Sequence, residues 1–587
     1  MTVSQVMSLD QMESDGDVDH TESPFVPICA SMILANDLPF EYFESYAMRN
    51  YIQCLNPNAV MPLINVIEAH VSDLYTKEKL KLKQELASIP NRISLTYDLW
   101  TSCTTETYIC LTAHFVDANW KFNSKVLNFS LVLPTEAEIC ERMVEFLNDW
   151  GIEKKIFSLT LDDSVKNDAL QKQLKSRLGL QNGLLCDGEF FHAHCFARVL
   201  KLIVEEGLKL VRRAVCKIRE SIIFARQSKS SRRKFKECVE KVGGVDSSVR
   251  LHLDMSMTVS SVYLMLESAV KYRRVFERFH LYEDNYASCP SKKQWRRVEK
   301  ICAFLLPLCE TANMINGTTH ATSNLYFMQV WKVQCVLVDS LGDEDEGIKI
   351  MAKRMMGKFK KYWDEYSVIL ALGAVLDPRM KFSRLDYCYS KLNPSTCKRK
   401  LKKVKTKLYM LFDKYSSKST SSGVQITTQG QSSTTPLQKN PESSSHDLFD
   451  ELKMHHQQLV TETGKSELDV YLDEPDLDFL CNEDMDVLQW WKSNSNRFPD
   501  LSILACDLLS VPMTTVASDF EFCMGSHVFN KYKHRMLPMN VETRICTRSW
   551  LYNFANDGGE DDEDYFEDIM NEIDGDDGDD DGEDDDE

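Results

Sequence analysis

The chain has 587 residues, more than one compact core holds, and 43% of them are hydrophobic, so three or four structural units are expected. Its formal net charge is −20, but residues 557–587 hold 20 Asp and Glu and no Lys or Arg, which leaves 69 acidic and 69 basic residues before them. No two of the 19 cysteines are closer than seven residues, no secretory signal is found, and no apolar run nears the ~18–20 residues that cross a bilayer. These features argue against a secreted disulfide scaffold, a zinc finger and a membrane protein.

The first 90 residues predict a polar terminus followed by helices. Residues 1–29 are acidic and polar and are expected to be disordered, whereas residues 30–90 are expected to be helical. The segment 78–86, EKLKLKQEL, combines helical spacing with strong helix formers.

From residue 91 the pattern changes to that of a sheet. Runs at 93–98, 108–116 and 121–133 resemble strands, and connectors such as DANW suit hairpins. Three antiparallel strands followed by alternating helix and strand predict an α/β sheet with helices on its faces, over residues 91–207. The elements predicted after the hairpins are a helix over 136–151, a strand over 155–163, a helix over 165–179, and a short strand or the start of a helix within 189–208.

The remainder predicts helices interrupted by one polar segment. Residues 208–415 are helix-rich, and the Ser, Thr and Gln of residues 416–465 predict a linker. A helical C-terminal unit spans 466–554, and the acidic residues 555–587 repel one another and are expected to be disordered. This tail is either a solvated solubility segment or a regulatory segment that competes with nucleic acid for a basic surface.

Two strands of the predicted sheet deliver a carboxylate at their ends. Asp98 ends the first strand and Asp162 ends the fourth, and these two strands can lie side by side. Converging carboxylates repel one another unless a divalent cation bridges them, and two Mg²⁺ ions held in this way can activate a water or a 3′-hydroxyl for attack on phosphorus. On spacing alone, the simpler interpretation is two ordinary turn-forming residues.

Several longer segments resemble one transposase family. LTYDLWTSCTTETYICLTAHFVDANWKFNSKVLNF (95–129), ALGAVLDPRMKF (371–382) and DVLQWWKSNSNRFPDLSILACDLLSVPMTTVASDFEF (486–522) are similar, in the same order, to segments of hAT-superfamily transposases, especially the domesticated plant group of DAYSLEEPER and RICESLEEPER. The resemblance covers about residues 30–553. It implies an α/β RNase H-like core interrupted by a large all-α insertion, with a C-terminal helical dimerisation region. The family normally carries an N-terminal BED zinc finger, which we do not find in this sequence.

The resemblance implies three acidic catalytic residues. Asp98 and Asp162 match the family's first and second Asp, and Asp519 stands at the position of its third acid, a Glu. In an intact site these three would bind Mg²⁺. An Asp is one methylene shorter than a Glu, so its oxygens fall about 1 Å short, and a displacement of that size can cost about 100-fold in rate.

Other positions depart from the family pattern as well. Arg198 follows Cys195 where the family's Cys-x-x-His motif has its His. Thr258 and Val259 replace an Arg and a Trp, and the Trp belongs near a flipped DNA base in such enzymes. Because the apolar framework is retained while chemical positions are altered, we expect a degenerate site that is not an enzyme and requires no cofactor.

Basic helices predict contact with DNA phosphates. The segment 209–237 is strongly basic, and we expect it to neutralise phosphates in a salt-sensitive, sequence-independent manner. A second segment, KRKLKKVKTK at 398–407, is a candidate nuclear-import signal. Each segment can also be an ordinary solvated helix face. The predicted DNA-binding residues are Arg212, Arg213, Lys217, Arg219, Arg226, Arg232, Arg233 and Lys234.

The C-terminal unit predicts a dimer interface. Trp-rich helical faces suit an obligate interface, and the family pairs its subunits through this region. The alternative is that the same side chains form only the core of their own chain. The predicted dimerisation residues are Trp490, Trp491, Leu501, Leu504, Leu508, Trp550 and Leu551.

We therefore expect a domesticated, catalytically inactive hAT transposase-like protein of the nucleus that binds DNA, forms homodimers and regulates transcription. One alternative is an active metal-dependent transposase or nuclease. Another is a DNA-independent partner that forms heterodimers with related hAT-derived proteins.

Overall fold

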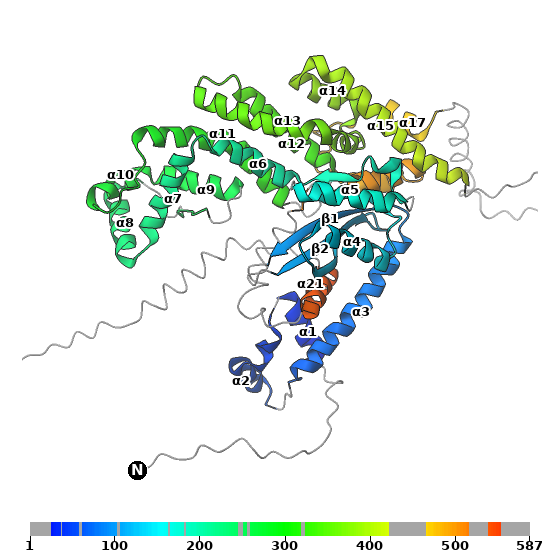
Figure 1. Cartoon of the computed structure of the whole chain (residues 1–587), viewed down its shortest axis with the longest axis horizontal. Helices are drawn as coiled ribbons and strands as arrows, with labels where there is room; N and C mark the ends of the chain where they lie inside the picture. Colours follow the sequence, from blue (N-terminus) through cyan, green and yellow to red (C-terminus); the bar gives the residue numbers. More distant parts are fainter. Residues whose placement is uncertain are drawn as a thin grey trace, which may run out of the picture.

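A five-stranded mixed sheet and a long helical body make up the described part of the chain (Figure 1). The sheet has the order β3-β2-β1-β4-β5, in which β1 pairs antiparallel with β2 and parallel with β4. The predicted adjacency of the first and fourth strands is therefore confirmed. The strands are β1 (Ile93–Thr101), β2 (Thr107–Val116), β3 (Phe122–Leu131), β4 (Ile156–Leu161) and β5 (His192–His194). The computed structural model describes residues 25–36, 38–57, 61–101, 106–161, 165–180, 183–244, 250–254, 259–317, 323–421, 465–512, 514–515 and 538–552.

Four helices pack with the sheet around one hydrophobic core. They are α3 (Ile64–Ser88), α4 (Glu136–Trp150), α5 (Val165–Leu180) and α21 (Pro538–Tyr552). The local sequence sets the ends of α4, because the Thr135 hydroxyl accepts the Glu138 N–H and Gly151 adopts a left-handed φ of 67°. Below this unit lie α1 (Phe25–Ala35), the 3₁₀ helix η2 (Phe40–Glu44) and α2 (Tyr46–Leu55) (Figure 1).

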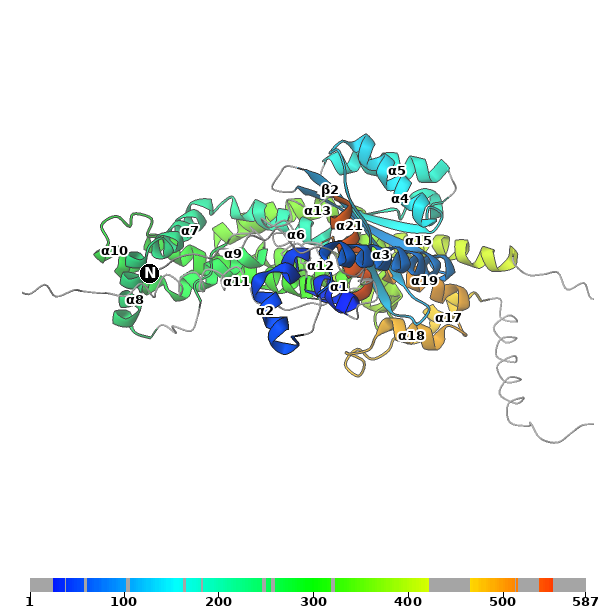
Figure 2. The same ribbon diagram turned by 90° about the horizontal axis from the view of Figure 1, so that it is seen from below.

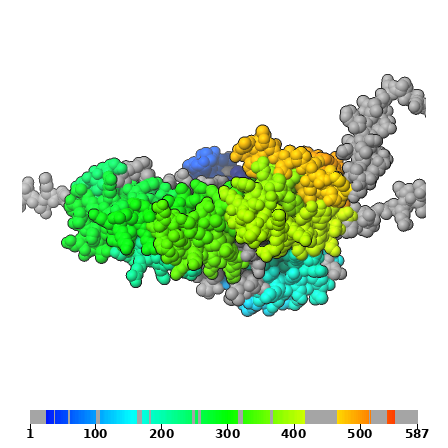
Figure 3. Space-filling view, turned by 90° about the horizontal axis from the view of Figure 1, so that it is seen from above, coloured from blue at the N-terminus to red at the C-terminus, as the bar shows by residue number. Residues whose placement is uncertain are grey.

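The helical body forms an elongated second unit with a continuous core. It runs from a lobe containing α7 to α11 at one end to α15 and the C-terminal helices at the other (Figures 2 and 3). The 3₁₀ helix η3 (Leu185–Gly188) precedes β5. The helices of the body are α6 (Phe196–Leu208), α7 (Arg212–Arg226), α8 (Lys229–Val242), α9 (Val259–Lys271), α10 (Arg273–Tyr282), α11 (Lys292–Gly317), α12 (Ser323–Ser340), α13 (Glu346–Val375), α14 (Lys381–Leu392), α15 (Pro394–Ser421), α17 (Glu467–Asp473), α18 (Val487–Asn494) and α19 (Pro499–Leu509).

Three predicted boundaries need correction. The helix α1 begins at Phe25 because its apolar side chains pack on α3, so residues 25–29 are helical. The helix α15 continues to Ser421, into the predicted linker. The strand β1 continues three residues past Asp98, because its antiparallel ladder with β2 extends to Thr101. The remaining residues predicted to be disordered, 1–24, 422–464 and 555–587, lie outside the described part of the chain. In the portion that the structure describes, no helix is both long and apolar enough to cross a membrane.

Candidate functional site

Asp98 lies half-buried in β1, at the centre of the sheet, opposite Cys110 of β2. On the other side of β1, Thr96 pairs with Thr160 of β4. In the sequence, Asp98 comes two residues after Thr96, and Asp162 comes two residues after Thr160. Asp162 itself and Asp519 lie outside the described residues, so the convergence of the three carboxylates stays a prediction.

Cys195 lies at the junction of β5 and α6, where its N–H donates to the Leu161 carbonyl at the end of β4. Its thiol is buried, and burial raises the pKa of Cys195, whereas hydrogen bonds from Thr515 lower that pKa and the negative charge of Asp98 raises it. Residues from the distant C-terminal region contact this thiol. The Thr515 N–H donates to Cys195 Sγ over 3.4 Å, and Sγ lies 3.9 Å from Thr514 Oγ1. Thr515 comes four residues before Asp519 in the sequence. The chain that leads to Asp519 therefore returns to the region of the sheet that holds Asp98.

Two more hydrogen bonds fix the chain that leads to Thr514. The Thr160 hydroxyl of β4 donates to the Pro512 carbonyl over 2.5 Å, and the Ser323 hydroxyl of α12 donates to the Leu508 carbonyl over 2.8 Å. Within α19, the buried Asp507 carboxylate accepts the Arg92 N–H at 2.6 Å and the Tyr415 hydroxyl. The end of α19 is thus held by the sheet and by the helical body together.

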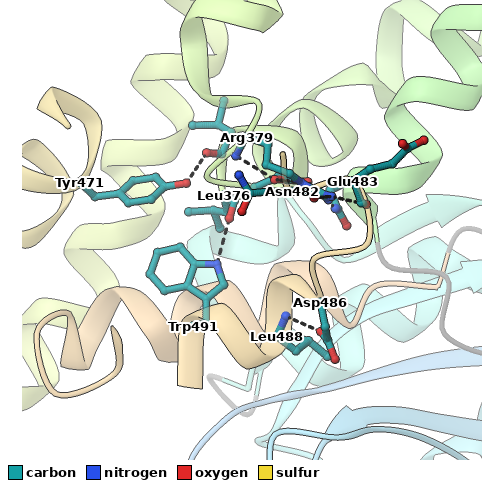
Figure 4. Close-up of polar contacts among 11 residues, drawn as sticks. Leu376, Arg379, Tyr471, Asn482, Glu483, Asp486, Leu488 and Trp491 are labelled. Atoms are coloured by element: carbon teal, nitrogen blue, oxygen red, sulfur yellow. Dashed lines mark hydrogen bonds and ion pairs between the residues drawn. The ribbon is translucent and has the colours of Figure 1, made fainter. Parts of the chain in front are cut away.

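A turn between α13 and α14, which we call the clamp turn (residues 376–381), holds the C-terminal helices in place (Figure 4). Arg379 is 4% exposed and pairs with the buried Asp377 at 2.8 Å. The same guanidinium donates to the carbonyls of Asn482 and Glu483, each over 3.0 Å. The Asn324 amide of α12 also donates to Asp377, at 2.9 Å. The clamp turn therefore satisfies its buried charges with carbonyl oxygens of the C-terminal region.

Lys381, the last residue of the clamp turn, and two aromatic residues of the C-terminal helices make further contacts between the two. The buried Lys381 ammonium donates to the carbonyls of Tyr471 and Glu474, over 2.6 and 2.9 Å, and lies over the Tyr471 ring. Burial lowers the pKa of Lys381. The Trp491 indole donates to the Leu376 carbonyl at 2.9 Å (Figure 4). From the sequence, this stretch was assigned only a resemblance to the hAT family and no structural role. Its available signal was three charged residues, Asp377, Arg379 and Lys381, inside an otherwise apolar run.

Two positions that depart from the family pattern lie within the described residues. Arg198 occupies the first turn of α6, three residues after Cys195. Val259 begins α9 and is 7% exposed in the core of the helical body, so it presents no ring for a base to stack on. His194, which precedes Cys195, is buried, and burial lowers the pKa of His194 to about 3, so its ring is neutral at pH 7.

Three of the predicted DNA-binding residues are already engaged inside the helical body. Arg219 pairs with the buried Asp254 at 2.6 Å. Lys217 donates to the Cys289 carbonyl, and Arg226 donates to a backbone carbonyl, that of Leu251. These contacts stabilise the lobe, which removes the three side chains from our set of phosphate ligands.

The other five predicted residues lie on the surface. Lys234 and Arg233 form ion pairs with Glu283 and Glu237. No ion pair or hydrogen bond from the remaining three side chains is found within the described chain. These three exposed residues are Arg212, Arg213 and Arg232.

The prediction for the dimer interface needs correction. Trp491 and the three predicted leucines of α19 have no exposed surface, because they pack in the core of their own chain, and Trp550 is only 9% exposed. A side chain without exposed surface cannot contact a second subunit in this conformation. Trp490 is partly buried against Tyr471, and Leu551 is 39% exposed. The intrachain alternative therefore holds for Trp491, Leu501, Leu504, Leu508 and Trp550.

A Mg²⁺ site would need residues beyond those described. Among the residues that the structure places, no three His, Cys, Asp or Glu side chains are grouped so as to hold a metal ion. Asp98 is the one predicted carboxylate ligand in this part of the chain. Its carboxyl oxygens are ligands that Mg²⁺ prefers, but a site for the ion depends on Asp162 and Asp519.

Family models match four stretches of this chain. The ZBED1 RNase-like domain matches residues 96–190, and its helical companion, the ZBED1 RNase-like helical domain, matches 193–304. The hAT-like transposase, RNase-H fold, matches 324–415, and the hAT family C-terminal dimerisation region matches 467–551.

Whole-chain relatives agree with these matches. The zinc finger BED domain-containing protein RICESLEEPER 2 of Oryza sativa subsp. japonica is 32% identical over 89% of this chain and 73% of its own length. The zinc finger BED domain-containing protein DAYSLEEPER of Arabidopsis thaliana is 30% identical over the same shares. A putative AC transposase of Zea mays is 28% identical over 88% of this chain and 64% of its own length. This chain therefore belongs to the hAT transposase family, in the group of the RICESLEEPER and DAYSLEEPER proteins.

Proposed function

We propose that this protein is a domesticated, catalytically inactive member of the hAT family that acts in the nucleus, binds DNA, forms homodimers and regulates transcription. One observation carries the DNA-binding part. The helical lobe, defined as residues 212–300, holds 21 Lys and Arg against 10 Asp and Glu, a net charge of +11, although the chain before its acidic tail is neutral. This lobe forms one end of the molecule, away from the sheet (Figures 1 and 2).

The surface of the helical lobe supports contact with phosphates. Arg212 and Arg213 lie at the start of α7 and Arg232 lies on α8, and all three are exposed. Guanidinium groups of this kind bind phosphate oxygens in pairs and release counterions. Such contacts fix a protein on DNA without reading its sequence.

The loss of catalysis is supported by three positions at which this sequence departs from the family pattern. A guanidinium carries hydrogen-bond donors and no acceptor, so Arg198 cannot ligate a metal as a His can. Asp519 is shorter than the Glu of the family, and the buried Val259 offers no stacking face. These changes replace the His, the Glu and the Trp of the family pattern, in a chain that still matches the family's RNase-like domains.

Nuclear localisation is supported by the exposed basic face of α15. Lys398, Arg399, Lys402 and Lys403 all lie on the surface of this helix. A cluster of Lys and Arg is the feature that import receptors recognise.

The salt dependence of DNA binding tests the proposal. We expect the full chain to bind nonspecific duplex DNA, with an affinity that falls as salt rises. The variant Arg212→Gln/Arg213→Gln/Arg232→Gln should flatten the slope of log affinity against log salt by about 2–3, because about 0.9 counterions are released per phosphate contact. Exposed lysines around the sheet provide the matched control, Lys77→Gln/Lys121→Gln/Lys154→Gln, which should keep the wild-type slope. No binding at low salt would favour a DNA-independent dimerising partner.

Catalysis is tested separately with supercoiled plasmid and Mg²⁺. We expect no nicking by the wild-type chain. Metal-dependent nicking that disappears in Asp98→Ala would overturn the inactive assignment and favour an active transposase or nuclease.

A further inference from the structure

The helix α8 presents a row of positive side chains on its outer face. Four of its basic residues follow helical spacing of three and four and therefore share one face, on which all four are exposed. The other side of the helix is fixed within the lobe, because Phe235 packs on Phe276 and Phe279 of α10, with ring centroids 5.1 and 5.4 Å apart. We call this row the α8 stripe, and it consists of Lys229, Arg232, Arg233 and Lys236.

The α8 stripe is open to a negatively charged ligand. The Arg233 side chain is 84% exposed, and its ion pair with Glu237 is long, at 3.5 Å. The stripe begins at the first residue of α8, where the backbone N–H groups of the helix add partial positive charge. It ends at Glu237 and the exposed Glu240. A ligand that carries several negative charges in a row fits such a surface.

The chain itself contains such a ligand. Residues 557–587, which we call the tail, hold 20 Asp and Glu and no Lys or Arg, and they lie outside the described residues. Taking the 21 basic and 10 acidic residues of the helical lobe from the 69 of each kind before the tail leaves 48 basic against 59 acidic residues. The rest of the chain therefore repels the tail on balance, whereas the helical lobe attracts it.

The basic helix α15 is a weaker candidate for this contact. An acid-rich stretch lies beside it, because the Tyr409 hydroxyl of α15 donates to Asp469 of α17 at 2.5 Å. Residues 467–486 hold nine Asp and Glu and no Lys or Arg. Lys407 of α15 is also paired with Glu189, at 2.6 Å. Part of the positive charge of α15 is therefore balanced within the described chain.

The tail is long enough to reach the α8 stripe. The helix α21 covers β3 at one edge of the sheet, and 35 residues follow its last residue, Tyr552. The sheet measures about 19 Å from β3 to β5, and α6 and α7, which lead from β5 to α8, add about 20 and 22 Å. An extended chain of 35 residues spans up to about 115 Å, well beyond this path.

We infer that the tail occupies the α8 stripe of its own chain when DNA is absent, and that DNA must displace it. This inference rests on the DNA-binding lobe of the proposed function and adds a regulator to it. Because the tail is tethered, its effective concentration is about 1 mM, so a weak contact with a dissociation constant of about 0.1 mM fills the stripe about 90% of the time.

A zero-length cross-link tests the position of the tail in the full chain. A carbodiimide joins a lysine amine to a carboxylate that contacts it, and the α8 stripe contains Lys229 and Lys236. Without DNA, we expect both lysines to be joined to the tail, as detected by mass spectrometry, and excess duplex DNA should suppress the products. In dimers assembled from isotope-labelled and unlabelled chains, the joined segments should carry the same label. The exposed Lys77 and Lys154 beside the sheet are the matched control and should not be joined to the tail.

Two variants test the effect of the tail on DNA binding. The neutral-tail variant has Asn and Gln in place of every Asp and Glu of the tail, and the α8 variant is Lys229→Gln/Arg232→Gln/Arg233→Gln/Lys236→Gln. Neutralising the tail should raise the affinity for nonspecific duplex about 10-fold at low salt in the wild-type background, but less than about 2-fold in the α8 variant. This gain should shrink as salt rises, because salt screens the contact between the tail and the stripe. A shuffled tail of unchanged composition is the control and should behave like wild type.

The outcomes separate the tail contact from simple repulsion of DNA. Equal gains in both backgrounds would mean that the tail repels DNA without binding α8, and would overturn the inference. Tail cross-links that are confined to α15, that form only between two copies, or that do not form at all would overturn it as well. If no variant binds duplex, the proposed function fails, and the cross-links to Lys229 and Lys236 still decide where the tail lies.

Discussion

Charged residues that are buried in this protein contact backbone carbonyls or oppositely charged side chains. Arg379 shows this most fully, since one guanidinium bridges Asp377 and two carbonyls of the C-terminal region. Replacing it with Met would leave the Asp377 carboxylate buried without its oppositely charged partner. We expect Arg379→Met to lower the free energy of unfolding by about 3–5 kcal/mol, measured by urea denaturation.

The matched control for this prediction is Arg399→Met. Arg399 is exposed on α15, so the change should stay within ~0.5 kcal/mol of wild type. Equal stabilities of the two variants would show that the clamp turn contributes little.

The buried His114 makes the free energy of unfolding depend on pH. Its Nε2 lies 3.0 Å from the Thr96 hydroxyl within the sheet, and burial lowers the pKa of His114 to about 3. In the unfolded chain a His titrates near 6.5, so below that pH the unfolded state binds the proton more readily. The stabilising effect of the neutral His114 is therefore fully present above about pH 6.5 and is lost as pH falls toward 3. We expect His114→Asn to make unfolding free energy less pH-dependent in this window, by up to about 1.4 kcal/mol per pH unit. An unchanged slope would contradict a neutral buried ring.

At the scale of elements, α21 protects the free edge of the sheet. The Val126 N–H of β3 donates to Ser549, and the Trp550 indole donates to the Val126 carbonyl over 2.7 Å. Trp550 also stacks on Tyr75 of α3, with ring centroids 5.1 Å apart. An uncovered edge strand invites pairing with another chain, so α21 serves as a cap for β3.

Replacing Trp550 should remove the protection that α21 gives to the edge strand β3. We expect Trp550→Ala to cost about 3–5 kcal/mol of unfolding free energy and to increase aggregation on heating. Leu480→Ala, at a residue that is 85% exposed, should stay within ~0.5 kcal/mol. A stable, soluble Trp550→Ala protein would show that the edge of β3 is protected without the Trp550 indole.

The hairpins and the adjacency of β1 and β4 were predictable from the sequence, whereas the place of β5 and the burial of the C-terminal helices were not. The alternation around Leu95 and the apolar run of β4 required two central strands, and a parallel pair follows from the intervening helix. An apolar helix face such as the one that contains Leu504 indicates only that another protein surface packs against it. The pattern cannot say whether the cover is the same chain or another, because both bury the same area. The same limit applies to Arg219, whose partner Asp254 is 35 residues away.

On the scale of the whole molecule, the C-terminal region joins the sheet to the helical body. The helix α19 buries Leu501, Leu504 and Leu508 in the core of the body, and α21 crosses to the outer edge of the sheet. Between α15 and α17 the described chain is interrupted from residue 422 to 464. The contacts that fix α17, α18 and α19 are therefore made by segments distant in sequence, including the clamp turn.

Cutting the chain in this interval should leave one particle. We place a site for a specific protease at about residue 440 of the full chain and cleave under native conditions. We expect both fragments to elute together in gel filtration and to separate in denaturant, because the clamp turn and α19 hold them without a covalent link. Trp491→Phe keeps the ring but loses the hydrogen bond to Leu376, so its fragments should separate at a lower urea concentration. Fragments that part in native buffer would mean that the linker, rather than these contacts, keeps the C-terminal region beside Cys195 and Asp98.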